Sequence, residues 1–140
     1  MGRILAVDYG RKRTGIAVTD PLQMIAGPVG TYSSAKVIDE LRKYMSCEEV
    51  ERIVVGEPRQ MDNTASEAEK YIAPFVKQLQ KAFPGMSIIR YDERFTSKMA
   101  SKAILDAGMK KSVRQDKALV DTVSAVIILQ SYLEMKGNDL

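Results

Sequence analysis

Ile4-Leu5-Ala6-Val7-Asp8 and Ile16-Ala17-Val18-Thr19 are two short, mostly apolar runs, separated by a turn rich in glycine and cations. Runs of this length around a turn predict two antiparallel strands. The first run ends on Asp8, and ligands of α/β proteins collect beyond the ends of such strands. This hairpin therefore predicts the start of a sheet and a first candidate site residue.

Further apolar patterns predict strands at 24–32, 52–56 and 86–91, and helices at 34–47, 65–83, 96–107 and 117–135. Ser33 or Ser34 is expected to cap the first helix, and the strand at 24–32, which contains Pro28, should lie at a sheet edge. A meander followed by alternating strands and helices predicts an α/β fold. We expect a mixed five-stranded sheet, a three-stranded antiparallel meander plus two parallel strands, with helices on both faces. Residues 1–140 fit one domain.

The composition excludes several classes of chemistry. The chain has no histidine, which excludes histidine bases, serine–histidine triads and imidazole zinc sites. The single cysteine, Cys47, excludes an internal disulfide, fits a reducing cytoplasm and is interpreted as a helix-packing residue. No apolar run is long enough for a bilayer, so we expect a cytoplasmic protein without membrane contact. Carboxylates, cations, hydroxyls or a bound metal must therefore carry the chemistry.

Three carboxylates form the candidate site. Asp8 ends the first strand, Glu93 follows the strand at 86–91, and Asp121 lies in the last helix. The helical neighbours of Asp121 are apolar, so a lone carboxylate there would be costly unless it were paired or metal-bound. Each residue also has a purely structural interpretation: Asp8 in a turn, Glu93 beside an arginine, Asp121 in a buried ion pair.

A divalent metal would account for the three carboxylates together. Two at strand ends and one on a packed helix would converge at one sheet edge, and Mg²⁺ and Mn²⁺ prefer oxygen ligands. One or two such ions can activate water for phosphodiester hydrolysis without a histidine. Glu57, which follows the strand at 52–56, is an additional candidate ligand, with a solvated loop acid as the alternative.

A basic segment lies between Glu93 and Asp121. Residues 94–117 hold seven cations and two carboxylates, a net charge of +5, against +3 for the whole chain. Such a run is usually a solvated face, but beside a metal site it suits contact with a phosphate backbone. The candidate nucleic-acid-binding residues are Arg13, Arg94, Lys98, Lys110, Lys111, Arg114 and Lys117.

Four blocks of the chain resemble the YqgF family, also called RuvX, in the family's order and spacing. They are LAVDYG at 5–10 with RTGIAVTD at 13–20, VVGEP at 54–58 with MDNT at 61–64, DERFT at 92–96, and DTVSAVIILQ at 121–130 with Tyr132-Leu133. The resemblance implies an RNase H-like fold, a cytoplasmic bacterial protein, and a nuclease role in maturing the 5′ end of small-subunit ribosomal RNA. It also implies that Asp8, Glu93 and Asp121 are the family's acidic triad.

Two positions depart from the family's pattern. Members usually carry an aliphatic residue in place of Glu57 and glycine in place of Asn63. Asn63 tolerates the left-handed conformation that glycine would supply. Glu57 would add a metal ligand or tune its loop.

The preferred hypothesis is a metal-dependent endonuclease acting on structured RNA, alone or on a pre-ribosomal particle, as a monomer or weak homodimer. In it Asp8 and Asp121 ligate metal, and Glu93 ligates metal or positions the attacking water. One alternative is a resolvase of branched DNA, which would need a dimer. Others are a nucleotide-binding module, because the turn at 8–15 resembles a phosphate-binding hairpin, and a non-catalytic RNA-binding or ribosome-assembly factor.

Overall fold

The computed structural model describes residues 2–58, 66–93 and 117–138, and within the last range the side chains of 122–136. The chain forms, in order, β1 (Arg3–Tyr9), β2 (Arg13–Thr19), β3 (Ala26–Ser33), the short 3-10 helix η1 (Ser34–Lys36), α1 (Val37–Cys47), β4 (Val50–Glu57), α2 (Glu69–Ala82), β5 (Ser87–Asp92) and α5 (Lys117–Asn138). None of the described helices is both long and apolar enough to cross a bilayer.

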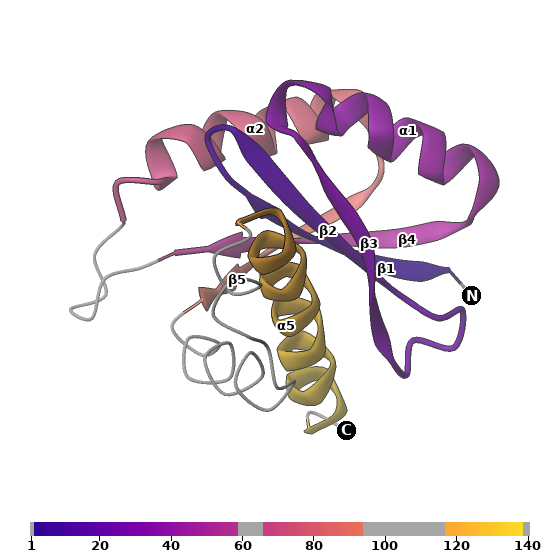
Figure 1. Cartoon of the computed structure of the whole chain (residues 1–140). Coiled ribbons are helices and arrows are strands. Elements are labelled where there is room, and N and C mark those ends of the chain that lie inside the picture. Colours follow the sequence, from indigo (N-terminus) through magenta and orange to yellow (C-terminus); the bar gives the residue numbers. More distant parts are fainter. Residues whose placement is uncertain (1, 59–65, 94–116, 139–140) are drawn as a thin grey trace.

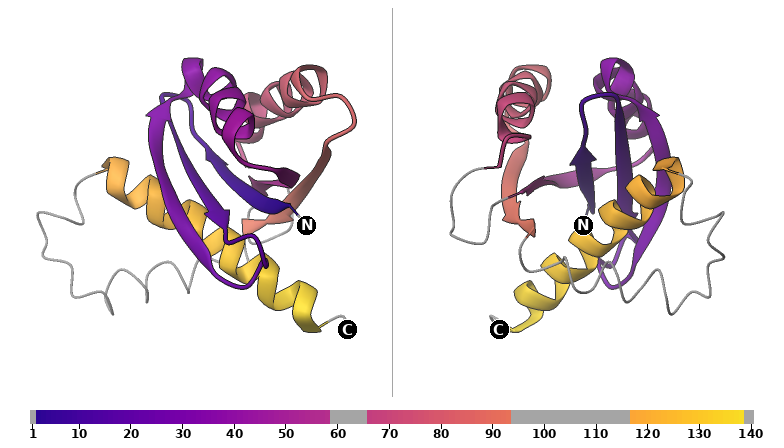
Figure 2. Two further views of the ribbon diagram at one scale, coloured as in Figure 1. Left: turned by 90° about the vertical axis from the view of Figure 1, so that its right-hand side faces the viewer. Right: turned by 60° about the vertical axis from the view of Figure 1, so that its left-hand side comes forward.

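The strands form one five-stranded sheet in the order β3-β2-β1-β4-β5. The β1–β2 and β2–β3 pairs are antiparallel, whereas β1–β4 and β4–β5 are parallel. Figure 1 shows α1 and α2 along one face of the sheet and α5 across the other, an arrangement that both views of Figure 2 repeat. The predicted meander, the two parallel strands, the edge position of β3 and helices on both faces are thus confirmed.

Strand alternation divides the core into two layers. On the side of α1 and α2, buried residues of the sheet and the two helices form one cluster: Leu5, Val7, Ile16, Val37, Leu41, Ile53, Val55, Ile72, Phe75 and Leu79. On the side of α5 the second cluster is Ile4, Ala6, Ala17, Val54, Tyr91, Ala125, Ile128, Leu129 and Tyr132. Even-numbered positions of β1 and β4 therefore face α5, and odd-numbered positions face α1 and α2.

Two local predictions were wrong. Helix α1 begins at Val37 without a side-chain cap, because the Ser34 hydroxyl instead donates to the Gly10 carbonyl over 2.6 Å and bonds Thr14 at 2.8 Å. Cys47, expected to pack against a helix neighbour, is exposed at the end of α1. The helix predicted at 96–107 lies outside the described residues, as do residues 110–114 of the basic segment.

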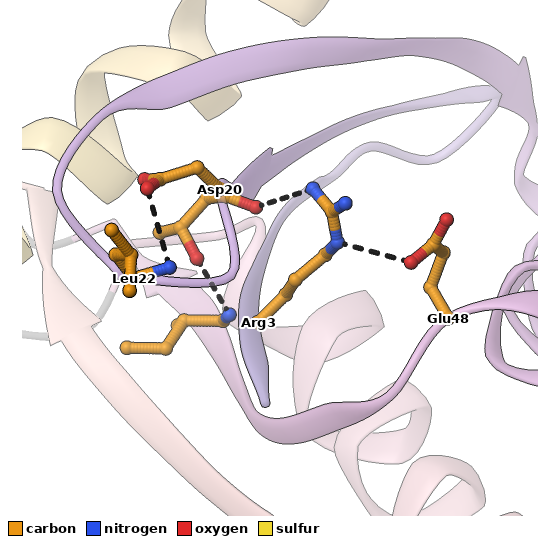
Figure 3. Close-up of polar contacts among 6 residues, drawn as sticks. Arg3, Asp20, Leu22 and Glu48 are labelled. Atoms are coloured by element: carbon orange, nitrogen blue, oxygen red, sulfur yellow. Dashed lines mark hydrogen bonds and ion pairs between the residues drawn. The ribbon is translucent and has the colours of Figure 1, made fainter. Parts of the chain in front are cut away.

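The end of the sheet where β1 begins is closed by short polar contacts (Figure 3). The Arg3 guanidinium contacts Glu48 at 3.3 Å and donates to the Thr19 carbonyl over 3.1 Å. The Asp20 carboxylate accepts the backbone N–H of Leu22 at 3.2 Å in the turn that follows β2. These contacts are local to the turn and strand ends around Arg3, whereas Asp8 lies near the opposite end of β1.

Candidate active site

Asp8 is the penultimate residue of β1 and lies on the α5 side of the sheet. It continues the alternation of Ile4 and Ala6, both buried against α5. In β2 its partner is Gly15. Because Val7 pairs with Val55 of β4, the next residue of β4, Gly56, lies on the other side of Asp8. The strand positions on either side of Asp8 are therefore glycines.

Glu93 follows β5 directly and reaches the same face. It continues the alternation of Ile89 and Tyr91, and its carboxyl packs over Gly56: a Cβ atom added at Gly56 would lie 2.9 Å from Glu93 Cδ. Burial, and next the negative charge of Asp8, raise the pKa of the Glu93 carboxyl from 4.5 to about 8, against the opposing charge of Arg90. The structure therefore brings Asp8 and Glu93 together across the end of β4.

Asp121 belongs to the first turns of α5, which pass over the same part of the sheet. It lies one turn before Ala125, which is fully buried in the α5-side core. The next residue, Thr122, is hydrogen-bonded through its hydroxyl to Thr31 of β3. Thr31 pairs with Gly15, which pairs with Asp8, so the bond fixes α5 above the row of residues that contains Asp8. The Asp121 side chain itself lies outside the described residues.

Glu57 is on the other face of the sheet. It follows Gly56 and lies with Val55 on the side of α1 and α2, where its carboxylate is 3.8 Å from the guanidinium of Arg90. Arg90 in turn makes two hydrogen bonds to Glu69 at the start of α2, of 2.7 and 2.9 Å. The structure does not bring Glu57 to the face that Asp8 and Glu93 share.

Of the candidate nucleic-acid contacts, Arg13 is the one whose side chain is described. It is exposed at the start of β2, at the Asp8 end of the sheet, and the alternation with Gly15 and Ala17 places it on the α5 side. Lys117 is the first residue of α5, but its side chain is outside the described part. Arg94, Lys98, Lys110, Lys111 and Arg114 lie outside it altogether.

The sequence interpretation missed the residues that shape this face. Gly15 and Gly56 flank Asp8, Thr31 and Thr122 connect β3 to α5, and Arg90 joins β5 to α2. Only the glycines carried a local signal, because glycine inside a strand often marks the close approach of another group.

The arrangement suits a bound cation. Two carboxylates that repel each other in a half-buried position gain from a neutralising positive charge, and oxygen donors match hard divalent ions. Within residues 2–58, 66–93 and 122–136, no three acidic or cysteine side chains are grouped as a complete metal site. Asp8 and Glu93 are therefore two candidate oxygen donors next to the start of α5.

Comparisons with known proteins show to which family the chain is related. The family model described as "RuvX: Holliday junction resolvase" matches residues 2–135. A protein of Porphyromonas gingivalis named "Putative pre-16S rRNA nuclease" is 59% identical over 134 residues, which cover 96% of this chain and 97% of the relative. A Parabacteroides distasonis protein of the same name is 57% identical over 140 residues and the full length of both chains.

Solved structures show the same fold. RuvC of T. thermophilus, in complex with a Holliday junction substrate, superposes with a TM-score of 0.57 at 14% identity and covers 97% of each chain. At that identity the likeness concerns the RNase H-like fold alone. The family model, by contrast, spans nearly the whole sequence, and the relatives are more than half identical over almost their full lengths. The chain therefore belongs to the RuvX family.

Proposed function

We propose that this protein is a metal-dependent endonuclease that hydrolyses phosphodiester bonds, and that its substrate is the 5′ end of precursor 16S ribosomal RNA. The observation that carries the proposal is the convergence of Asp8 and Glu93 over Gly56, on the face that α5 crosses. The names of the relatives from P. gingivalis and P. distasonis support the RNA substrate. The protein would act in the cytoplasm, as one nuclease domain over residues 1–140.

The residues present fit Mg²⁺ or Mn²⁺. All the candidate ligands are carboxylates, the donor type that these ions prefer, and the raised pKa of Glu93 reflects an excess of negative charge that a cation would offset. When bound, one or two such ions would activate water and stabilise the leaving oxygen. Asp8 and Asp121 would hold the metal.

The remaining roles belong to the chain's own side chains. Glu93 would complete the metal ligands or accept a hydrogen bond from the attacking water and so orient it. Arg13, exposed at the same end of the sheet, would bind a phosphate beside the cleaved bond. This contact would be extended along the phosphate backbone, with little reading of bases, by Arg94, Lys98, Lys110, Lys111, Arg114 and Lys117.

A second candidate is cleavage of branched DNA, favoured by the description of the family model and by the RuvC fold. Symmetric cutting of a four-way junction needs two active sites related by a twofold axis. A strict monomer in sedimentation, at the concentration where cleavage is seen, would count against this candidate.

The test is cleavage of a precursor ribosomal RNA and a four-way DNA junction side by side, with Mg²⁺, Mn²⁺ or chelator. Wild type is compared with Asp8→Asn and with Asp20→Asn, a matched removal of a carboxylate at the far end of β2. We expect metal-dependent cutting of the RNA that Asp8→Asn abolishes and Asp20→Asn retains. Cutting of neither substrate by folded wild type would refute the nuclease function.

A further inference from the structure

Arg90 connects three parts of the molecule on the face opposite Asp8 and Glu93. Its neighbours in β5, Ile89 and Tyr91, pack towards α5, and Arg90 extends to the α2 side. There its two terminal nitrogens hydrogen-bond both carboxylate oxygens of Glu69, at 2.7 and 2.9 Å. Both side chains are only 23% exposed. A bidentate, half-buried pair of this kind is among the stronger and more directional contacts that side chains make.

The same guanidinium also reaches the end of β4. One terminal nitrogen lies 3.8 Å from the Glu57 carboxylate, and the other donates a long hydrogen bond of 3.4 Å to the Gly56 carbonyl. Glu57 is the last residue of β4 and Glu69 the first of α2. Arg90 therefore holds the chain where it leaves the sheet and where it returns as a helix.

Gly56 lies between Arg90 and the candidate site, and it contacts both Arg90 and Glu93. The Gly56 carbonyl accepts the Arg90 hydrogen bond. The Glu93 carboxyl packs against the Gly56 Cα, because an added Cβ atom would lie 2.9 Å from Glu93 Cδ. Because the Glu93 carboxyl occupies the space that a Gly56 side chain would need, we expect a shift of the Gly56 main chain to displace it. Gly56 also pairs with Tyr91 of β5, whereas the pairing of β4 with β1 ends one residue earlier, at Val55.

Lysine could not make this set of contacts. Arginine presents five donors in a planar fork, whereas the lysine ammonium is a single charge on a flexible stem. Retaining the positive charge would therefore not retain the simultaneous contacts to Glu69, Glu57 and Gly56.

We propose that Arg90 is a positioning residue of the metal site: by joining Gly56 and Glu57 to Glu69, it holds the main chain on which Glu93 rests, and Glu57 is its partner instead of a metal ligand. This inference rests on the proposed function. Removing groups that orient metal ligands costs about 10- to 100-fold in metal affinity or activity, and we expect a loss in that range.

The test compares Arg90→Lys and Arg90→Met with Arg52→Lys. Arg52 is a matched control, because it is a half-buried arginine of β4 whose guanidinium donates over 2.5 Å to Tyr132 of α5, near the other end of the strand. For each protein we would measure the metal-free melting temperature, its rise with Mn²⁺, the Mn²⁺ concentration for half-maximal cleavage, and kcat. A purely structural role would lower the metal-free melting temperature and leave the Mn²⁺ response unchanged.

We expect both Arg90 variants to need about 10-fold or more Mn²⁺ and to lose kcat, with Arg52→Lys responding to Mn²⁺ as wild type does. A normal Mn²⁺ response in Arg90→Lys would overturn the proposal, since charge alone would then suffice. If Arg90→Met does not fold, Glu69→Gln, which keeps Arg90, must raise the Mn²⁺ requirement. Wild type that neither gains stability with Mn²⁺ nor cuts RNA would instead refute the proposed function.

Discussion

The carboxyl carbon of Glu93 lies where a side chain at Gly56 would begin, 2.9 Å from the position of an added Cβ atom. Gly56 belongs to β4, and Glu93 directly follows β5. The sequence of either segment alone does not reveal this contact. Because Gly56 has no side chain, the Glu93 carboxylate can lie beside Asp8.

Gly56→Ala should disable the site. The new methyl group would lie 2.9 Å from both Glu93 Cδ and Ile128 Cδ1, so at least one of these side chains must shift, and Ile128 is fully buried in the core. We expect loss of cleavage together with about 1–3 kcal/mol of stability, the usual cost of overpacking. Denaturant unfolding and the cleavage assay measure the two effects. Gly27→Ala is the control, because its Cβ would meet only the Val18 carbonyl, at 3.9 Å; full activity of Gly56→Ala would contradict the packing argument.

The stability of the metal-free protein should fall as the pH rises from about 4.5 to about 8. The pKa of Glu93 is raised in the folded state, mainly by burial, so the folded protein holds this proton more tightly than the unfolded chain does. Ionisation in this window therefore costs stability, about 1–3 kcal/mol after allowance for solvent screening.

Urea unfolding in chelator at several pH values across this window measures the slope. Glu93→Gln, which has no charge to bury, should flatten it and be more stable than wild type at neutral pH. An equal slope in wild type and Glu93→Gln would show that Glu93 does not titrate in this range.

Thr31 and Thr122 should be coupled in stability. Their hydroxyls are hydrogen-bonded between β3 and α5, and removing one leaves the other without this bond in a half-buried position. Thr122→Val should cost about 1 kcal/mol, and adding Thr31→Val should cost little more. A double-mutant cycle of unfolding free energies tests this. Purely additive losses would mean that the bond contributes nothing.

Asp20→Ala should loosen the turn after β2 without affecting cleavage. The pKa of the Asp20 carboxyl is lowered, chiefly by the backbone N–H groups of Ile25 and Met24, which it accepts at 2.8 Å each. Because this pKa is depressed, the stabilisation is present above pH 3.8 and disappears as the pH falls through the lower folded value. We expect Asp20→Ala to melt at a lower temperature than wild type at neutral pH but not in strong acid. Impaired cleavage by Asp20→Ala would contradict the prediction that this turn is separate from the active site.

The sequence could predict the sheet because its strands are short apolar runs between turn residues, as in residues 4–7 and 53–55. It could also predict that Asp8 and Glu93 share an edge, since both follow strands that lie in the same sheet. The face of Glu57 was harder to predict, because a strand buried on both sides does not alternate in hydrophobicity. Its place became clear only from Arg90 and Glu69.

Contacts between distant residues explain the rest. Thr31 and Thr122 are 91 residues apart, and nothing in either local sequence selects the other. The missing cap of α1 has a similar origin: Ser34 has the right residue type, but the Gly10 carbonyl, 24 residues earlier, accepts its hydroxyl proton.

The order of the strands also bears on how the protein is made. Asp8 is synthesised early, but its parallel neighbour β4 and then β5 come much later, and α5 comes last. A nascent chain that ends before β4 thus carries Asp8 without Glu93, without Asp121 and without the Gly56 main chain on which Glu93 rests. Under the proposed function, an unfinished polypeptide would be inert towards the ribosomal RNA around it, and nuclease activity would begin only once α5 has been added.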